Sequence, residues 1–191
     1  MTFQVFIAMC ARAWSLTVLA LIDAGTPART TPLAAAAQAS RAAIAASLER
    51  LRVLGLVSDN QGHGHPLRPA VQLSSTGRVA ALGASRLLAI IDNESDRQVL
   101  RRVWTLPLLL AIDEPVSFGE LRRRLAPITD RALSQALKTL IDKQWVIREW
   151  PADSNGRNAH YVCTAAGTTL RTSLASWVTL PWRATRPQRR D

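Results

Sequence analysis

The chain of 191 residues has only two cysteines, Cys10 and Cys163. Two thiols are too few for a disulfide framework and too isolated for a metal-ligand cluster, so we expect a cytoplasmic protein that folds without either. Long apolar runs are also missing. The apolar stretch over residues 2–25 lacks a cationic start, and Arg12 interrupts it well short of the ~20 residues that a membrane span needs. The sequence therefore predicts neither a signal peptide nor a membrane span.

Patterns of catalytic residues are absent as well. There is no glycine-rich phosphate loop, and the carboxylates fall on predicted helix faces or caps, so we expect neither an enzyme nor a cofactor. His63, His65 and His160 lie in predicted loops, without the spacing or supporting groups of a metal site. The sequence therefore favours a binding protein without a metal.

Acidic residues are scarce. Fourteen Asp and Glu stand against 24 Lys and Arg, which gives a net charge of +10 and a pI of about 11.4. Such a surface favours polyanions. A hydrophobic content of 48% is enough for one ordinary core or two small ones.

Three blocks of the sequence occur twice in the same order. "RAWSLTVLALID" returns as "RRVWTLPLLLAID", with Trp14 and Trp104 90 residues apart (104 − 14). "SRAAIAASLERLRVLGLV" returns as "TDRALSQALKTLIDKQWV" at a separation of 89 (146 − 57), and "LSSTG" as "CTAAG" at 90 (167 − 77). Chance similarity of alanine-rich helices is the alternative, but the agreement in order and spacing favours a tandem duplication.

Each half is predicted to form a helix, a short helix, a longer helix, two strands and a closing helix. In the second half the first helix should have Thr105 as its cap and Pro107 in its first turn. Residues 126–128 form a sharp connection, and Thr129 caps the longer helix. That helix should bury an apolar stripe and turn polar side chains outward. The buried stripe comprises Leu133, Leu137, Leu140 and Ile141, and the outer face Arg131, Ser134, Gln135 and Lys138.

The domain organisation follows from these patterns. We predict a mostly α-helical fold with small β-hairpin wings (α+β), made of two units over residues 1–90 and 91–180 in a pseudo-twofold arrangement. A helical segment from Gly77 joins them, "NESD" caps a further helix, the last helix ends near Leu180, and residues 181–191 form a basic flexible tail.

Two short helices joined by a tight turn, the second one capped and polar outside, are typical of the DNA-binding helix-turn-helix. Base edges suit Arg131, Ser134, Gln135 and Lys138. Contacts with phosphates, or from the wings, are predicted for a larger set: Arg122, Arg123, Arg124, Thr129, Arg148 and Arg157 in the second half, and Arg41, Arg52 and Arg68 in the first.

The second half resembles the winged helix-turn-helix regulators of the HxlR type, within the MarR-like group of bacterial repressors. The resemblance rests on "VWTLPLLLAI", "VSFGELRRRLAPITDRALSQALKTLIDKQWVIRE" and "YVCTAAG". It implies a cytoplasmic transcription regulator that binds double-stranded DNA, with an effector that the sequence does not identify. Those families usually dimerise, so this chain is expected to act as a homodimer or as a pseudo-dimeric monomer.

Three alternatives stay open. The arginine run could be a solvated helix face. Either unit could be a protein-interaction module that has lost DNA binding, above all the first, where the repeat places Ala42, Ala45, Ala46 and Glu49 opposite the polar residues of the second. Cys10 is expected to be an inert buried thiol with an ordinary pKa, whereas some regulators of this type carry a redox-sensing cysteine on the first helix.

Overall fold

The computed structural model describes residues 1–60, 70–150 and 159–181. Two compact units divide the chain. The first contains Met1 and residues 7–103, and the second contains residues 2–6 and 104–191. Helix α1 (Phe3–Cys10) therefore begins in the second unit and ends in the first.

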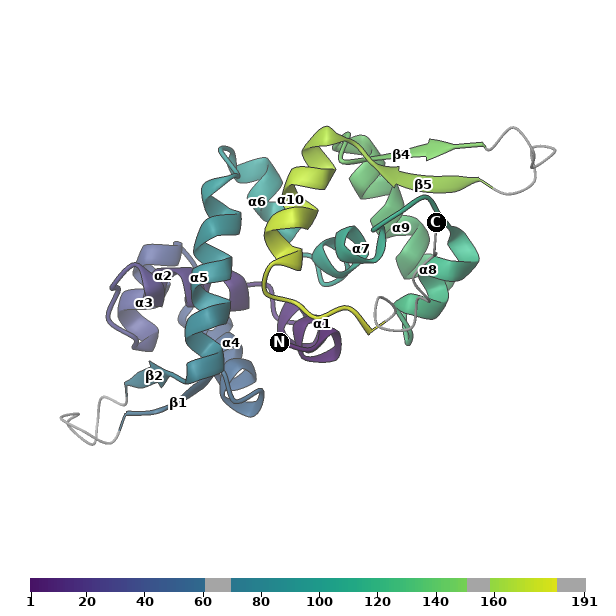
Figure 1. Ribbon diagram of the computed structural model, residues 1–191. Coiled ribbons are helices and arrows are strands. Elements are labelled where there is room, and N and C mark those ends of the chain that lie inside the picture. The colour runs from purple at the N-terminus through teal and green to yellow at the C-terminus, as the bar shows by residue number, and fades with distance from the viewer. Residues whose placement is uncertain (61–69, 151–158, 182–191) are drawn as a thin grey trace. The chain divides into compact units, whose positions relative to one another are not determined.

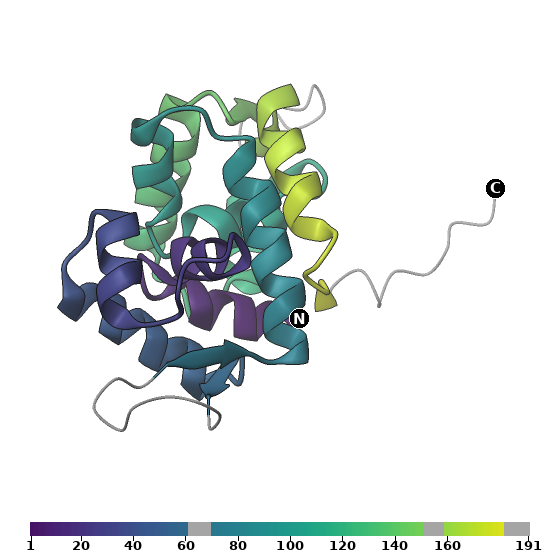
Figure 2. The same ribbon diagram turned by 90° about the vertical axis from the view of Figure 1, so that its left-hand side faces the viewer.

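The first unit is mostly helical (Figure 1, Figure 2). Its core is aliphatic, and Leu19, Leu33, Ile44 and Leu87 are completely buried. Val57 pairs with Leu73 in its short antiparallel hairpin. In chain order the elements are α2 (Ser15–Asp23), α3 (Thr30–Ala37), α4 (Arg41–Val53), β1 (Val57–Asp59), β2 (Val71–Leu73), α5 (Ser75–Ala89) and α6 (Glu94–Leu100).

The second unit packs its helices around α7 (Thr105–Ala111), which is buried along its whole length. A helix that is apolar on every side is stable only inside a core. The strand order is β3-β5-β4, all antiparallel, with Arg148 opposite Tyr161 and Val116 on the other side of Tyr161. In chain order the elements are α7 (Thr105–Ala111), β3 (Val116–Ser117), α8 (Phe118–Arg124), α9 (Asp130–Asp142), β4 (Val146–Glu149), β5 (His160–Cys163) and α10 (Ala165–Ala175).

The predicted class, mostly α with small antiparallel sheets, is confirmed. The caps at Asn93 and Thr129 are also confirmed, because each side chain accepts a hydrogen bond from the backbone N–H three residues later. Thr105 was predicted as a cap, but it is the first residue of α7, and Trp104 holds the cap position without a side-chain bond. Trp14 and Trp104, which the repeat pairs, are both half-buried.

Two boundaries differ from those predicted. The first unit extends past residue 90 to Val103, because α6 packs with it: Arg97 donates to the carbonyl of Ile91, and the Arg101 guanidinium stacks on Trp14. The last helix ends at Ala175 instead of near residue 180. Beyond this helix the chain contacts residues 2–6 of the same unit. The ring centroids of Phe6 and Trp177 lie 5.5 Å apart in an edge-on arrangement, and Thr2 forms a β-bridge with Thr179.

In both units the same pair of hydrogen bonds ties the start of the closing helix to the chain just after the longer helix. In the first unit the Ser74 hydroxyl donates to the carbonyl of Gly55 and accepts from the N–H of Gly77. In the second unit Thr164 makes the corresponding bonds with Gln144 and Gly167. Both closing helices thus approach the preceding strand so closely that only glycine fits at their third residue.

This close approach predicts the effect of adding one methyl group. In Gly77→Ala or Gly167→Ala the new Cβ would overlap a backbone carbonyl oxygen, of Leu56 or Trp145 respectively. Because backbone cannot yield as a flexible side chain does, we expect either change to lower the free energy of unfolding by at least about 2 kcal/mol. Gly119→Ala is the control, since nothing lies within 4 Å of its added Cβ. Urea denaturation measures all three, and equal stability of the Gly167 and Gly119 variants would contradict the prediction.

Candidate nucleic-acid interface

The helix-turn-helix of the second unit consists of α8, a turn over residues 125–129 and α9. Ser117 caps α8 through the N–H of Glu120, at 3.3 Å. Thr129 caps α9 through the N–H of Ala132, at 3.2 Å. A cis peptide bond joins Ala126 and Pro127 in the turn. Both helix starts are thus fixed by side chains that their own sequence supplies.

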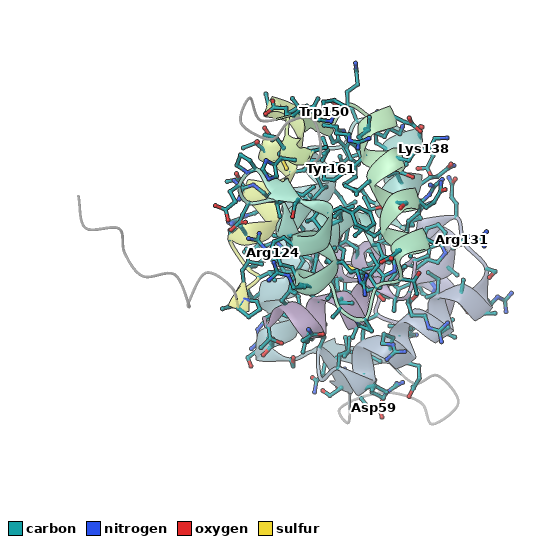
Figure 3. All side chains as sticks on the ribbon, turned by 90° about the vertical axis from the view of Figure 1, so that its right-hand side faces the viewer. Asp59, Arg124, Arg131, Lys138, Trp150 and Tyr161 are labelled. Atoms are coloured by element: carbon teal, nitrogen blue, oxygen red, sulfur yellow. The ribbon has the colours of Figure 1, made fainter. Side chains whose placement is uncertain are left out.

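The predicted outer face of α9 is confirmed. Leu133, Leu137 and Leu140 are buried, while Ile141 is half-buried. Figure 3 shows Arg131 near one end of the helix and Lys138 farther along it. Within the described residues, no hydrogen bond or ion pair occupies the side chains of the four predicted base-contacting residues, all of which are exposed: Arg131, Ser134, Gln135 and Lys138.

Arg122 and Arg123 also face outward, with side chains 61% and 78% exposed. Arg122 lies 3.3 Å from Asp130, and Arg123 forms an ion pair with Glu120. Exposed ion pairs of this kind contribute about 0–1 kcal/mol. Either arginine can therefore exchange its carboxylate for a phosphate at little cost.

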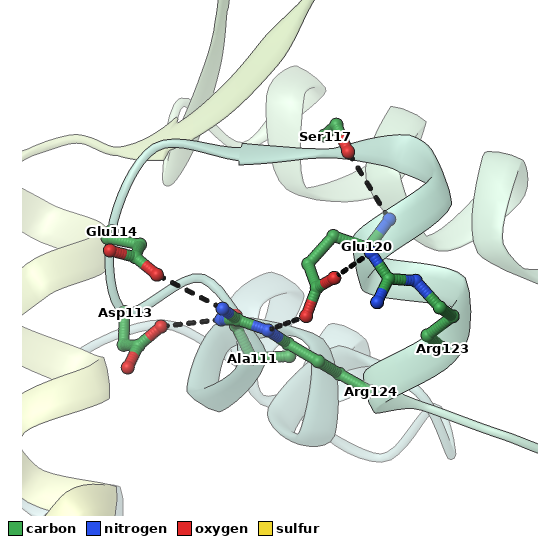
Figure 4. Close-up of polar contacts among 7 residues, drawn as sticks. All are labelled: Ala111, Asp113, Glu114, Ser117, Glu120, Arg123 and Arg124. Carbon is green, nitrogen blue, oxygen red and sulfur yellow. Dashed lines mark hydrogen bonds and ion pairs between the residues drawn. The ribbon is translucent and has the colours of Figure 1, made fainter. Parts of the chain in front are cut away.

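Arg124 has a different place, which corrects the expectation that all three arginines suit phosphates. Its side chain is only 8% exposed and ends in a cluster of acidic groups (Figure 4). The guanidinium lies 2.6 Å from Asp113, 2.8 Å from Glu120 and 3.1 Å from Glu114. It also donates to the carbonyl of Ala111 at 2.8 Å. Arg124 therefore joins α8 to the end of α7 and is not an external cation.

The wing of the second unit presents an arginine and an aromatic ring together. The Arg148 guanidinium lies 4.9 Å from the ring centroid of Trp150, a residue that is 54% exposed. Trp150 was not among the predicted contact residues. Arg157 and Arg68, predicted as wing contacts, lie outside the described residues. Stacking on an exposed tryptophan holds the charge of an arginine at the surface and restricts the orientation of its guanidinium.

A groove runs between α9 and the wing. One hollow of about 210 Å³ and a second of about 440 Å³ share Phe118, Arg148 and Tyr161 in their walls. Lys138 and Ser134 line the smaller hollow, so the outer face of α9 opens into it. Sequence reasoning did not find Phe118 or Tyr161. Each of these aromatic residues fits the ordinary apolar pattern of its segment, so the sequence alone does not mark either one as part of a surface groove.

The corresponding surface of the first unit has fewer cations. Ser40 caps α4 as Thr129 caps α9. Arg41 is exposed, and so are Ala42, Ala45 and Glu49, with Ala46 half-buried. Arg52 is bound within the unit, at 2.7 Å from both Glu49 and Asp59, and its hydrogen bond to Asp59 helps to raise its pKa.

The two cysteines are free thiols. Cys10 is buried, and burial raises the pKa of its thiol, so the expectation of an ordinary pKa was wrong. Cys163 is half-buried and donates to the carbonyl of Ile112 at 3.4 Å, and burial raises its pKa to about 11. Among the described residues no three His, Cys, Asp or Glu side chains group as metal ligands. His63 and His65 lie outside those residues.

A capped helix-turn-helix followed by an antiparallel hairpin makes the second unit a winged helix-turn-helix. Residues 99–184 match the family described as HxlR-like helix-turn-helix. This match supports a DNA-binding transcription regulator of the HxlR type, since helix-turn-helix domains bind double-stranded DNA. No curated protein and no solved structure matches the chain.

No single helix in the described ranges is long and apolar enough to cross a membrane. Helices α1 and α2 together pass that test by length and composition only, and they are bent by 101° at the break between them.

The acidic cluster around Arg124 predicts unequal effects from two adjacent arginines. Arg124→Gln would remove the cation that lies 2.6 Å from the carboxylate of Asp113, whose side chain is 2% exposed, so we expect the free energy of unfolding to fall by about 3–5 kcal/mol. Arg123→Gln removes an equal charge from a 78% exposed side chain and should change stability by less than about 1 kcal/mol. Thermal and urea denaturation of both variants check this. Two variants of equal stability would show that the cluster does not hold the unit together.

The raised pKa of both thiols predicts how alkylation of the two cysteines depends on pH. A raised pKa lowers the fraction of a thiol that is present as thiolate at every pH below that pKa. At pH 8 this fraction is about a thousandth for Cys163, and it is smaller still for Cys10. Iodoacetamide should therefore react slowly with the native protein and faster as pH rises towards 11, with Cys163 ahead of Cys10. Mass spectrometry of quenched samples measures the two rates, with urea-unfolded protein as the reference. Rapid modification of native Cys10 at pH 7 would contradict its burial.

Proposed function

We propose that this chain is a sequence-specific regulator that binds double-stranded DNA, and that its second unit reads most of the bases. The observation that carries the proposal is the outer face of α9, a helix capped by Thr129, where four polar side chains point outward without partners among the described residues. The major groove is wide enough to admit such a helix. Arg131 and Gln135 are the residues able to make bidentate contacts with guanine and adenine.

Phosphate contacts would come from both sides of α9. Arg122 and Arg123 lie on the preceding helix, and Arg148 lies on the wing beyond it. Thr129 accepts a hydrogen bond from the backbone of α9, and its own hydroxyl proton suits a phosphate oxygen. Cations that flank a recognition helix fix its register on the duplex, while the helix itself reads the sequence.

We also propose that the two units arose by duplication of one winged helix-turn-helix. The series from α2 to α5 and from α7 to α10 have the same order of helices and strands, apart from β3 in the second. The bonds of Ser74 and Thr164, and the close approach at Gly77 and Gly167, occur at positions that the repeat pairs. Local geometry of this detail supports the duplication more strongly than composition does.

In this proposal the first unit contributes little base readout. Its α4 presents alanines where α9 has Arg131, Ser134 and Gln135, and alanine offers only an apolar contact to a thymine methyl group. Glu49 replaces Lys138, and Arg52 is held by two carboxylates. The preferred DNA site should therefore be asymmetric, with one well-defined half.

Recovery of bound genomic fragments would give the DNA site, and titrations at several salt concentrations would test each residue. Arg131→Ala and Gln135→Ala should each reduce discrimination by about 1–3 kcal/mol at a base position. Arg123→Ala should weaken all duplexes alike and reduce the salt slope by roughly one unit. Arg41→Ala is the matched variant at the start of α4 and should leave sequence preference unchanged.

Two results would contradict the proposal. If Arg41→Ala reduces specificity as much as Arg131→Ala, or a perfect palindrome binds best, the units share readout equally. If no duplex binds in a salt-dependent manner, the winged helices serve protein interaction instead.

A further inference from the structure

Helix α5 of the first unit has one buried face and one open face. Helix α2 packs against it, and its buried residues are Gly77, Ala80, Ala81, Gly83, Ala84 and Leu87. On the open face Val79 is 56% exposed and Leu82 is 45% exposed, and Ile90, directly after the helix, is 40% exposed. These are three of the six large apolar residues that are exposed in the described part of the chain. Apolar side chains gathered in one place on a surface indicate a contact site.

The open face has the spacing of a surface that receives another helix. Val79, Leu82, Arg86 and Ala89 follow one another at separations of 3, 4 and 3 residues (82 − 79, 86 − 82 and 89 − 86), and all four are exposed. Residues three and four apart lie on one stripe of a helix, and this is the spacing by which two helices pack side by side. Because the opposite face is packed on α2, the stripe is presented on a fixed support.

The second unit shows that the fold does not require apolar residues at these positions. The repeat pairs Val79 with Thr169 and Leu82 with Thr172, each at a separation of 90 (169 − 79 and 172 − 82), and both threonines of α10 are exposed. A helix face that meets only water is normally polar, as this face of α10 is. The apolar stripe of α5 is therefore a property of the first unit alone.

The charges beside the stripe indicate the sign of its partner. Arg78 and Arg86 are exposed, and α5 contains no Asp or Glu. Among the described residues the one carboxylate that bonds to α5 is that of Asp23, which accepts a hydrogen bond from Ser85 at 2.6 Å. A second copy of α5 would bring arginines together without supplying a carboxylate to either. Phosphates would pair with the arginines but would gain nothing from Val79 and Leu82.

We propose that the outer face of α5 docks a helix of another protein, one that has an apolar stripe with Asp or Glu beside it. The apolar side chains of that helix pack on Val79 and Leu82, and its carboxylates pair with Arg78 and Arg86. The first unit, whose α4 offers little to DNA, thereby contributes a contact with a protein. This role goes beyond DNA binding and does not depend on it.

Selection from a displayed library of helical peptides tests the proposal, with the full chain and without DNA. The library has leucine at spacings of three and four residues, and its other positions are random. Peptides that bind the double variant Val79→Thr/Leu82→Thr, which gives α5 the threonines of α10, are removed first. We expect the native chain to enrich peptides with Asp or Glu beside the leucines. Enrichment of neutral or basic peptides, or of none, overturns the proposal.

Two charge reversals separate a local contact from the net charge of the chain. Arg86→Glu should weaken the most enriched peptide roughly fivefold or more in fluorescence anisotropy, because like charges then face each other. Exchanging one Glu of the peptide for Arg should restore part of that loss. Arg29→Glu, at an exposed arginine before α3, changes the net charge equally and should keep the affinity within roughly twofold. Equal losses for Arg86→Glu and Arg29→Glu overturn the proposal.

Two further measurements identify a different occupant, and either one would overturn the proposal. If Val79→Thr/Leu82→Thr dissociates an assembly of the native chain in sedimentation, a second copy covers this face. If a duplex of random sequence displaces the peptide and Arg86→Glu weakens that duplex, DNA covers it. Because the peptide assays contain no DNA, their failure is distinct from a failure of the DNA-binding proposal.

Discussion

The buried guanidinium of Arg124 is the interaction on which the geometry of the second unit depends. It binds carboxylates from the segment after α7 and from α8 itself, together with the carbonyl of Ala111. A planar cation with several fixed donors holds such groups at defined angles. Arg124 thus links α8 to the end of α7 and to the segment that follows it. Loss of this cation would therefore disturb the two helices before α9, although Arg124 itself is not part of the outer face of α9.

Most of the fold could be predicted from the sequence because its signals are local. The stripe of Leu133, Leu137 and Leu140 repeats at helical spacing, and the caps at Asn93 and Thr129 act within three residues. The second unit's extra strand β3 could not be predicted, since Val116 and Ser117 form it only by pairing with β5, far along the chain. A strand of two residues that forms only through long-range pairing has no recognisable pattern in the sequence.

The outer face of α9 is exposed as predicted, whereas Arg124 is not. Arg122, Arg123 and Arg124 are identical in the sequence, but successive residues on a helix point about 100° apart, so they cannot share one environment. Glu120, four residues before Arg124, is a signal for an ion pair within the helix. The partners Asp113 and Glu114 become visible only when α7 and α8 are packed together.

The placement of residues 2–6 has a consequence for synthesis. They belong to the second unit, where they meet Trp177 and Thr179. During translation these residues emerge long before their partners, so Phe3 and Phe6, both buried in the finished protein, stay exposed until nearly the whole described chain has left the ribosome. Residues 2–6 can complete the second unit only after Trp177 and Thr179 have been synthesised. A fragment that starts at residue 104 would lack residues 2–6.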